Sequence, residues 1–194
     1  MLFSKFLTSF ILICLLWGFS NQSFAQLTQL YPSLKVINQV SIYPSYTDST
    51  VQVFLFYSPD CPICTAFVPY IRQIKQQFEG QGVQFALILP QSLRYKISEI
   101  RKHEVLDSIA MNTYLDKKNK MTQTLGAIIT PQVFVFVGPQ QVYSGLINDL
   151  YYAVGQVNHQ KLKHFLSNYL HKVISRQNYK IQNTNPVGCL ISSW

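Results

Sequence analysis

The sequence contains few charged residues, few cysteines and no internal repeat. Charged residues make up 12% of the 194 residues, whereas 48% are hydrophobic and the chain has 13 Phe and 12 Tyr. This composition excludes disorder for most of the length, because disordered chains are rich in charge and poor in aromatic residues. A sizeable core is available, and the length fits one domain with appendages rather than two full domains.

Long apolar runs are missing after residue 25. The run from Phe6 to Trp17 follows the cation Lys5 and precedes a small-x-small triplet at 23–25, which is typical of a cleaved signal peptide. At about a dozen residues, the run is shorter than the roughly 20 that a membrane-spanning helix needs. An uncleaved anchor and a lipid-modified Cys14 are the weaker interpretations. We therefore predict a signal peptide at 1–25 and a soluble, exported mature protein, located in the periplasm or cell envelope, or secreted where there is no outer membrane.

The mature chain has an odd number of cysteines. Removal of the leader takes away Lys5 and Cys14 and leaves Cys61, Cys64 and Cys189, with 15 basic residues, 8 acidic residues and a net charge of +7. An odd count argues against a framework of disulfides. Because an exported CxxC pair meets oxidants, its presence favours redox work over a permanent dithiol.

The basic residues are spread out rather than gathered in a stripe. Acidic residues, namely Glu99, Glu104, Asp107 and Asp116, interrupt the basic residues Arg94, Lys96, Arg101, Lys102, Lys117, Lys118 and Lys120. This pattern is typical of a solvated helical face, whereas nucleic-acid binding favours a basic stripe with interleaved aromatic residues. We expect no nucleic-acid partner, and a weak association with acidic surfaces stays open.

The strongest local signals predict a strand, a helix and a second strand. Residues 51–57 are a continuous β-branched and aromatic run, which indicates a strand buried on both faces. From Cys61 to Phe78 apolar residues recur at helical spacing, and Gly80 and Gly82 end the predicted helix. A second buried strand is predicted at 83–89. This order indicates a right-handed βαβ unit with parallel strands.

The remaining elements are predicted around that unit. A lead-in segment at 26–50 has at most one edge strand near Val36 to Ile42, and a tail at 175–194 lies over the surface. The predicted domain at 51–174 further contains a mainly helical insertion at about 91–126, divided near Asn112, a β-hairpin of 132–137 and 142–145, an irregular segment at 147–158, and an amphipathic helix at 160–174.

The pair Cys61 and Cys64 carries the chemistry. Two cysteines three positions apart at a helix start lie on one face within disulfide reach, and the first sulfur lies against unpaired backbone N–H groups. A helix terminus stabilises a thiolate by up to about 2 kcal/mol, which brings the pKa of a cysteine from about 8.5 to near 7. Asp60 opposes this shift. We expect Cys61 to attack a disulfide and Cys64 to resolve the mixed disulfide, or the same pair to oxidise a dithiol.

Two other interpretations of the CxxC pair are weaker. A structural zinc site needs four ligands, and the remaining Cys189 and the histidines are not paired at ligand spacing; these are His103, His159, His164 and His171. A buried structural disulfide is the other alternative.

The dipeptide Thr130-Pro131 is a second signal. A proline just before a central apolar strand fits the first strand position, often with a cis bond, where its neighbour's backbone meets a substrate. An ordinary proline at a strand start is the alternative.

These motifs resemble the thioredoxin superfamily. The resemblance lies in the segment from Tyr57 to Cys64, followed by Leu125-Gly126-Ala127 ahead of Thr130-Pro131. It implies an α/β fold with a central mixed sheet flanked by helices, in which the first cysteine attacks and the cis-proline faces it. The 67 positions from Cys64 to Pro131 suit the redoxin-domain branch, which has a helical insertion before the cis-proline strand and includes TlpA/ResA-like thiol reductases and peroxiredoxins. Residues 142–149 and 188–194 are similar to peroxiredoxin-like redoxin-domain proteins.

The sequence departs from the family patterns in three respects. The buried aspartate of thioredoxins falls on Leu55, so another group or water must handle protons. The peroxiredoxin signature Pro-x-x-x-Thr-x-x-Cys meets Phe54 and Ser58, which disfavours peroxide reduction as the primary function. Asp60 replaces the tryptophan that precedes the thioredoxin cysteine, which should alter partner choice.

The resulting expectation is an exported thiol-disulfide oxidoreductase involved in redox homeostasis. Its partners would be protein thiols or disulfides and an unidentified electron donor or acceptor, and Pro62, Ile63, Thr130 and Pro131 would bind the substrate. No metal and no cofactor beyond a redox-active Cys61–Cys64 disulfide is expected.

Several alternatives stay open. One is a peroxiredoxin-like peroxide reductase with antioxidant activity, and a less favoured one is an SCO-like copper(I) carrier that uses His159. Cys189 is either a third redox cysteine that exchanges with Cys61 or a tail residue packed by Leu190, Ile191 and Trp194, and the structural role is slightly favoured.

Overall fold

A computed structural model describes residues 34–38, 50–91 and 97–191. The predicted signal peptide, most of the lead-in segment and the last residues of the tail lie outside these ranges. No helix within the described ranges has both the length and the apolar character needed to cross a membrane.

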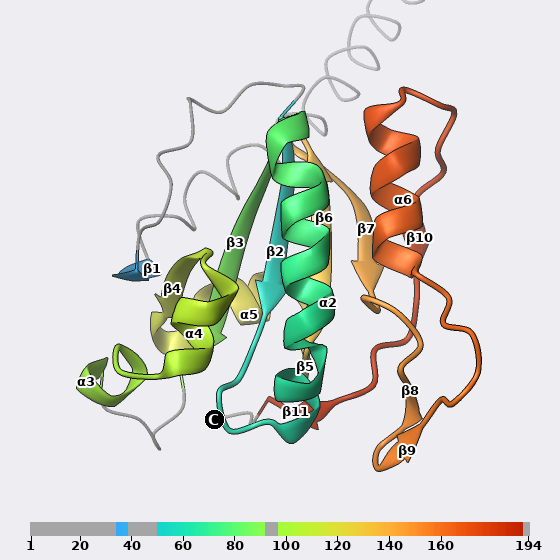
Figure 1. The fold of residues 1–194 in the computed structure, drawn as a ribbon. Helices are drawn as coiled ribbons and strands as arrows, with labels where there is room; N and C mark the ends of the chain where they lie inside the picture. The colour runs from blue at the N-terminus through green and yellow to red at the C-terminus, as the bar shows by residue number, and fades with distance from the viewer. Residues whose placement is uncertain (1–33, 39–49, 92–96, 192–194) are drawn as a thin grey trace, which may run out of the picture.

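A seven-stranded mixed sheet forms the centre of the molecule (Figure 1). Its strands, in spatial order, are β1 (Leu34–Asn38), β4 (Asn112–Asp116), β3 (Val83–Pro90), β2 (Val51–Phe56), β6 (Gln132–Val137), β7 (Gln140–Gly145) and β10 (Gln182–Asn183). Strands β2, β3 and β4 are parallel, β6 runs antiparallel to β2, and β7 runs antiparallel to β6. At the two edges, β1 is antiparallel to β4 and β10 is parallel to β7.

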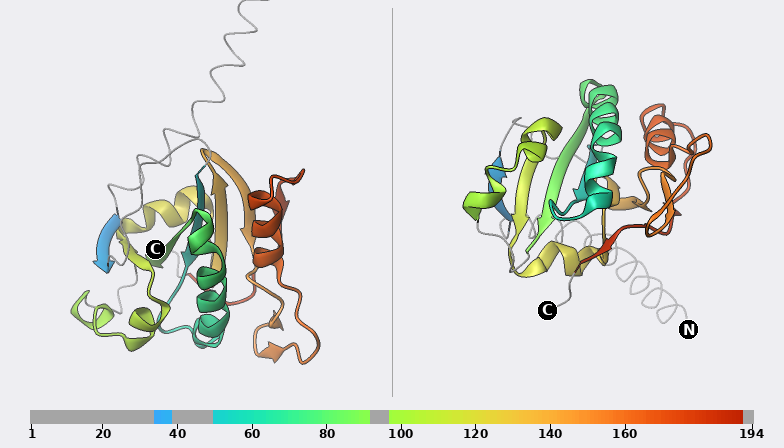
Figure 2. Two further views of the ribbon diagram at one scale, coloured as in Figure 1. Left: turned by 45° about the horizontal axis from the view of Figure 1, so that its top comes forward. Right: turned by 60° about the horizontal axis from the view of Figure 1, so that its bottom comes forward.

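Helices cover both faces of the sheet (Figure 2). The helices and 3-10 turns are α2 (Pro62–Phe78), η2 (Glu79–Gln81), α3 (Ile97–Ile100), α4 (Glu104–Ile109), η3 (Lys117–Asn119), α5 (Lys120–Leu125) and α6 (Phe165–Ile174). Helices α2, α4 and α6 contribute to the larger core on one face, and α5 lies on the opposite face. Short strand pairs complete the fold, namely β5 (Ile129–Thr130) with β11 (Cys189–Leu190), and β8 (Tyr151–Ala153) with β9 (Gln156–Val157).

Strand β2 is the centre of the packing. All six of its residues are buried, because alternate side chains enter two separate apolar clusters. Val53 and Leu55 face the α2 side, whereas Phe54 and Phe56 face the α5 side. The predicted strand, helix and parallel strand at 51–89 are confirmed, as is the mixed sheet flanked by helices.

The segment at 91–126 contains the expected helices, α3, α4 and α5, but it also contains the strand β4, which was not predicted and lies between β1 and β3. Polar side chains fill three of the buried positions of this strand, so its sequence lacks the apolar run that marks β2. Two of these side chains, Thr113 and Asp116, form hydrogen bonds to residues close by in the chain. The Thr113 hydroxyl donates to the Met111 carbonyl at 3.0 Å, and the buried Asp116 carboxylate accepts from the Thr122 amide at 2.7 Å at the start of α5.

Three further elements differ from the prediction. Helix α6 begins at Phe165 rather than at residue 160. The preceding backbone is instead held by side chains, since the Lys163 amide donates to Asp149 Oδ1 at 2.6 Å and the Gln160 amide donates to Asn158 Oδ1 at 2.9 Å. The segment at 147–158 forms the small β8–β9 hairpin. The tail does not only lie over the surface: β10 extends the sheet and β11 pairs with β5.

Candidate redox site

Cys61 lies at the N-cap of α2, directly after the turn that follows β2. Its amide donates to the Ser58 carbonyl at 3.1 Å, which closes that turn, and Pro62 occupies the first turn of the helix. The amide of Cys64 donates to Cys61 Sγ at 3.5 Å. This N–H group has no partner within the helix and is directed at the sulfur instead, and the contact favours a thiolate when Cys61 is reduced.

The second part of the site is the short strand β5 and the proline that follows it. The Thr130–Pro131 peptide bond is cis, the isomer predicted from the sequence. Cys61 Sγ lies 3.3 Å from the Thr130 carbonyl oxygen, so the loop and the start of α2 are in contact. The buried side chain of Gln132 fixes this loop, because its Oε1 accepts from the amides of Ile128 and Ile129 at 3.1 and 3.4 Å. A glutamine at the start of an apolar strand gave no sequence signal for this role.

The third part of the site is the tail. Cys61 forms a disulfide with Cys189, whereas Cys64 is a buried free thiol. The disulfide present therefore differs from the expected Cys61–Cys64 bond. Strand β11 brings Cys189 opposite Thr130 in an antiparallel register, and Figure 1 shows β11 and β5 beside the start of α2. The sequence contained only a weak signal for this pairing, the Gly188-Cys189 dipeptide.

Cys64 lies in a fully enclosed position. Its side chain is 0% exposed, and this burial raises the pKa of its thiol to about 12, although hydrogen bonds from the Ser58 backbone and the Thr130 hydroxyl oppose the shift. Burial, followed by the charge on a nearby Cys64 thiolate, also raises the pKa of Tyr57 to about 12. In the disulfide-bonded state shown here, Cys64 is therefore a protonated thiol at neutral pH.

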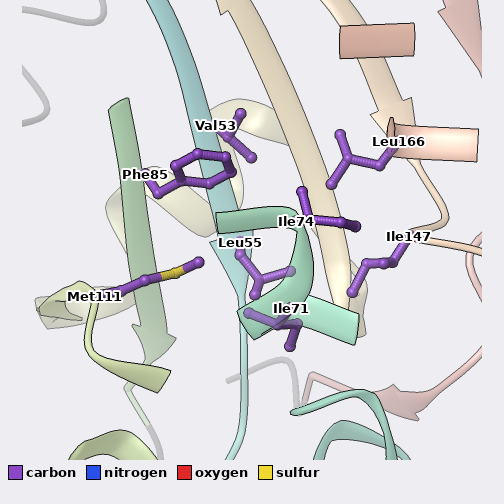
Figure 3. Close-up of a pocket in the computed structure, with 8 residues that line it drawn as sticks. All are labelled: Val53, Leu55, Ile71, Ile74, Phe85, Met111, Ile147 and Leu166. Atoms are coloured by element: carbon purple, nitrogen blue, oxygen red, sulfur yellow. The ribbon is translucent and has the colours of Figure 1, made fainter. Parts of the chain in front are cut away.

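The surroundings of Leu55 contain no group that could replace the thioredoxin aspartate. Figure 3 shows a small apolar cavity beside it, between the sheet and helices α2 and α6. The cavity is lined by Val53, Leu55, Ile71, Ile74, Phe85, Met111, Ile147 and Leu166. None of these side chains ionises, whereas Tyr57 and Thr130 are polar side chains that interact with Cys64.

The other predicted site residues lie at different depths. Pro62 and Asp60 are exposed, whereas Ile63 is buried in the larger core. His159 is exposed, and no group of three His, Cys, Asp or Glu side chains suited to a metal ion exists among the described residues. The proposed copper ligands Cys61, Cys64 and His159 thus do not come together.

A cysteine at a helix start, facing a cis-proline loop at the end of a mixed sheet, defines a thioredoxin-like thiol oxidoreductase. The chain belongs to the Redoxin family, whose model matches residues 29–144. The tail with Cys189 lies beyond the matched residues. No curated protein matches the sequence.

Two solved structures share the fold at low sequence identity. A hypothetical protein from Sinorhizobium meliloti 1021 is 17% identical, with a TM-score of 0.64 over 74% of this chain and 80% of that chain. An uncharacterized conserved protein from Geobacillus kaustophilus is 14% identical, with a TM-score of 0.63 over 82% of this chain and 93% of that chain. These similarities concern the fold alone.

Proposed function

We propose that the protein is an exported thiol-disulfide oxidoreductase that acts on protein disulfides or dithiols through Cys61 and Cys64. The observation that supports this function is the position of Cys61 Sγ, which accepts a hydrogen bond from the Cys64 amide at 3.5 Å and lies 3.3 Å from the Thr130 carbonyl oxygen. A nucleophile, a second thiol three residues later in the first turn of α2 and a backbone edge suited to a client are thus close together.

In the reductive direction the reaction has two exchanges. The Cys61 thiolate attacks a client disulfide, a Cys61–client bond forms, and one client sulfur leaves as a thiolate and takes up a proton. Cys64 then loses its proton and attacks Cys61 Sγ, which releases the second client thiol and forms Cys61–Cys64. The client gains two electrons, and an external dithiol restores the pair. The oxidative direction is the reverse.

Reduction of insulin with dithiothreitol as electron source tests this function. The full-length mature protein should accelerate insulin precipitation, and Cys61→Ser should abolish the acceleration because the remaining thiol at this helix start, Cys64, is buried. The exposed control Tyr152→Ala should retain the rate of the parent. A Cys61→Ser protein as active as the parent would remove the proposed function.

Export is the second element of the proposal, and it is based on the sequence at 1–25. Expression in a bacterium with an outer membrane, followed by osmotic release, should give a protein whose first residue is Gln26. A cell-associated protein that retains residues 1–25 would contradict this element without affecting the exchange reaction.

Peroxide reduction is the second candidate function. It is favoured by the bond between Cys61 and a cysteine on a distant segment, because a peroxide-oxidised cysteine condenses with a second thiol to give such a disulfide and water. Hydrogen peroxide loss with a thiol donor measures it. A rate no faster than that of free cysteine would dismiss it.

A further inference from the structure

We propose that residues 187–191 are an internal substrate strand and that Cys189 is a third redox cysteine, which passes its bond with Cys61 to Cys64. The site would then alternate between a closed form with the Cys61–Cys189 disulfide and an open form with the Cys61–Cys64 disulfide. This inference rests on the proposed exchange function of Cys61 and Cys64. It adds that the tail occupies the position of a client peptide, and it names the sequence feature that this position requires of a client.

The tail binds as an extended peptide would bind. Cys189 and Leu190 pair with Thr130 and Ile129 in an antiparallel register, and the Ile191 amide donates to the Ile128 carbonyl at 2.9 Å. The Thr130 hydroxyl donates to the Cys189 carbonyl at 3.5 Å. Most of these contacts are made by main-chain groups, which every peptide carries, so the same edge can accept another strand when the tail leaves.

Gly188 shows what this position demands of a client. A Cβ atom at Gly188 would overlap with the Thr130 carbonyl oxygen and would approach Ile129 Cγ2 to 2.7 Å. The backbone at Gly188 is not in the left-handed region, so glycine is required here for space and not for conformation. The edge therefore selects a strand with glycine directly before its cysteine.

A fixed anchor keeps the released cysteine close. Thr184 Oγ1 accepts from the Leu146 amide at 2.8 Å and lies 3.1 Å from the Tyr143 hydroxyl oxygen, and the Thr184 amide donates to the Ser144 carbonyl at 2.9 Å. The backbone of Thr184 also lies directly against Gly145, where a Cβ would overlap with it. Only a short segment separates this anchor from Cys189, so a high effective concentration of the thiol at Cys61 follows.

The exchange between the two forms conserves atoms and electrons. Cys64 gives up its proton and attacks Cys61 Sγ, the Cys61–Cys64 bond forms, and the Cys61–Cys189 bond breaks. The electron pair leaves on the Cys189 sulfur, which takes up a proton, so no external oxidant or reductant is consumed. The Thr130 hydroxyl contacts both partners of this exchange, because it donates to the Cys189 carbonyl at 3.5 Å and its hydrogen bond to Cys64 lowers the pKa of that thiol.

Disulfide mapping tests the exchange. The mature protein is oxidised with diamide, quenched with acid, alkylated and digested with trypsin without reduction. Cys61 and Cys64 fall in the peptide 36–72, and Cys189 falls in the peptide 181–194, so the two disulfides give different masses. The parent should contain both forms, and Cys64→Ser should contain only the cross-linked peptides. A Cys64→Ser protein without the cross-link would overturn the proposal.

A pair of glycine variants tests the substrate-like fit. Gly188→Val should lower the yield of the Cys61–Cys189 cross-link at least about tenfold and raise that of Cys61–Cys64, because the strand no longer fits beside β5. Gly80→Val is the matched control, since a Cβ there meets no atom within 4 Å, and it should leave the yields unchanged. Equal cross-link yields in both variants would overturn the proposal. If Gly188→Val fails to fold by circular dichroism, Gly188→Ala repeats the comparison.

A peptide assay measures the same preference for glycine before the cysteine, without a substitution at position 188 of the protein itself. Two peptides with the sequence of 185–191, one native and one with Gly188→Val, are activated at cysteine as mixed disulfides with thionitrobenzoate. The reduced Cys64→Ser/Cys189→Ser protein should release the dye from the glycine peptide about tenfold faster. Equal rates with the two peptides would overturn the glycine requirement, whereas no reaction with either peptide, together with an inactive parent in the insulin assay, would remove the proposed function itself.

Discussion

The two segments that meet at the Cys61 sulfur are held in very different ways. Strand β2 and helix α2 place Cys61 through buried side chains in two apolar clusters. The tail places Cys189 through a few hydrogen bonds and one disulfide, and its Leu190 side chain remains 79% exposed. Because the first segment depends on burial and the second mainly on hydrogen bonds, the disulfide and the partly buried Cys189 and Ile191, we expect the tail to open more readily than the segment that holds the nucleophile.

The largest difference between the two segments should appear when the core is altered. Phe54→Ala removes a fully buried ring that contacts Phe136 at a centroid distance of 5.7 Å, and we expect the free energy of unfolding to fall by about 3 to 5 kcal/mol. Urea unfolding measures this loss. The exposed control Tyr152→Ala should change it by no more than about 0.5 kcal/mol. A small effect of Phe54→Ala would contradict the assignment of β2 as the centre of packing.

The second largest effect should come from the covalent link between the segments. The Cys61–Cys189 bond joins residues 128 positions apart, and such a bond stabilises a folded chain by about 2 to 4 kcal/mol, mainly by restricting the unfolded state. Oxidised Cys189→Ser should therefore unfold at lower urea than the oxidised parent. With dithiothreitol the two proteins should have similar midpoints. If dithiothreitol did not change the urea midpoint of the oxidised parent, the Cys61–Cys189 bond would not be the disulfide that prevails in it.

A smaller and local effect should follow from loss of the tail anchor. Thr184→Val removes the acceptor of the Leu146 amide, and we expect a cost of about 1 to 2 kcal/mol. In the reduced protein, hydrogen exchange at residues 182–191 should become about tenfold faster while the exchange of β2 stays the same. The same substitution at the exposed Thr124 is the control. Equal acceleration of exchange in β2 and in the tail would contradict the conclusion that the two segments are held in different ways.

The smallest expected effect concerns the ionisation of the Cys64 thiol. In the closed form the pKa of Cys64 is raised to about 12, so its thiolate fraction should rise with pH through the whole range between about 9 and 12, and its alkylation by iodoacetamide should rise with it. The unfolded protein should instead reach half of its maximal rate at about pH 8.5 and level off above about pH 10. Mass spectrometry of the peptide 36–72 measures both rates. A half-maximal rate at about pH 8.5 in the folded, oxidised protein would contradict the burial of this thiol.

The fold could be predicted where side chains alternate or repeat with a clear period. The apolar run at 51–57 and the helical spacing up to Phe78 predicted the centre of the sheet and the position of Cys61. Strand β4 could not be found in this way, because Asn112, Thr113 and Asp116 occupy buried positions, and Thr113 and Asp116 form hydrogen bonds that no periodicity reveals.

Only the local motifs of the candidate site could be predicted from the sequence. The CxxC spacing and the Thr130-Pro131 dipeptide are local patterns, and they are legible in the sequence. The bond to Cys189, the close approach of Gly188 and the role of Gln132 depend on segments that are distant in the chain. Such contacts are set by the tertiary arrangement, so a single sequence gave Cys189 two interpretations.

The apolar lining of the cavity beside Leu55 has a consequence for proton access. No ionisable side chain lines that cavity, so the cavity itself supplies no proton relay to the buried Cys64 thiol. The Thr130 hydroxyl acts on this thiol from the side of β5 and β11, where the tail lies. In the proposed exchange, undocking of the tail would open this side to bulk water and to the acidity of the surrounding compartment.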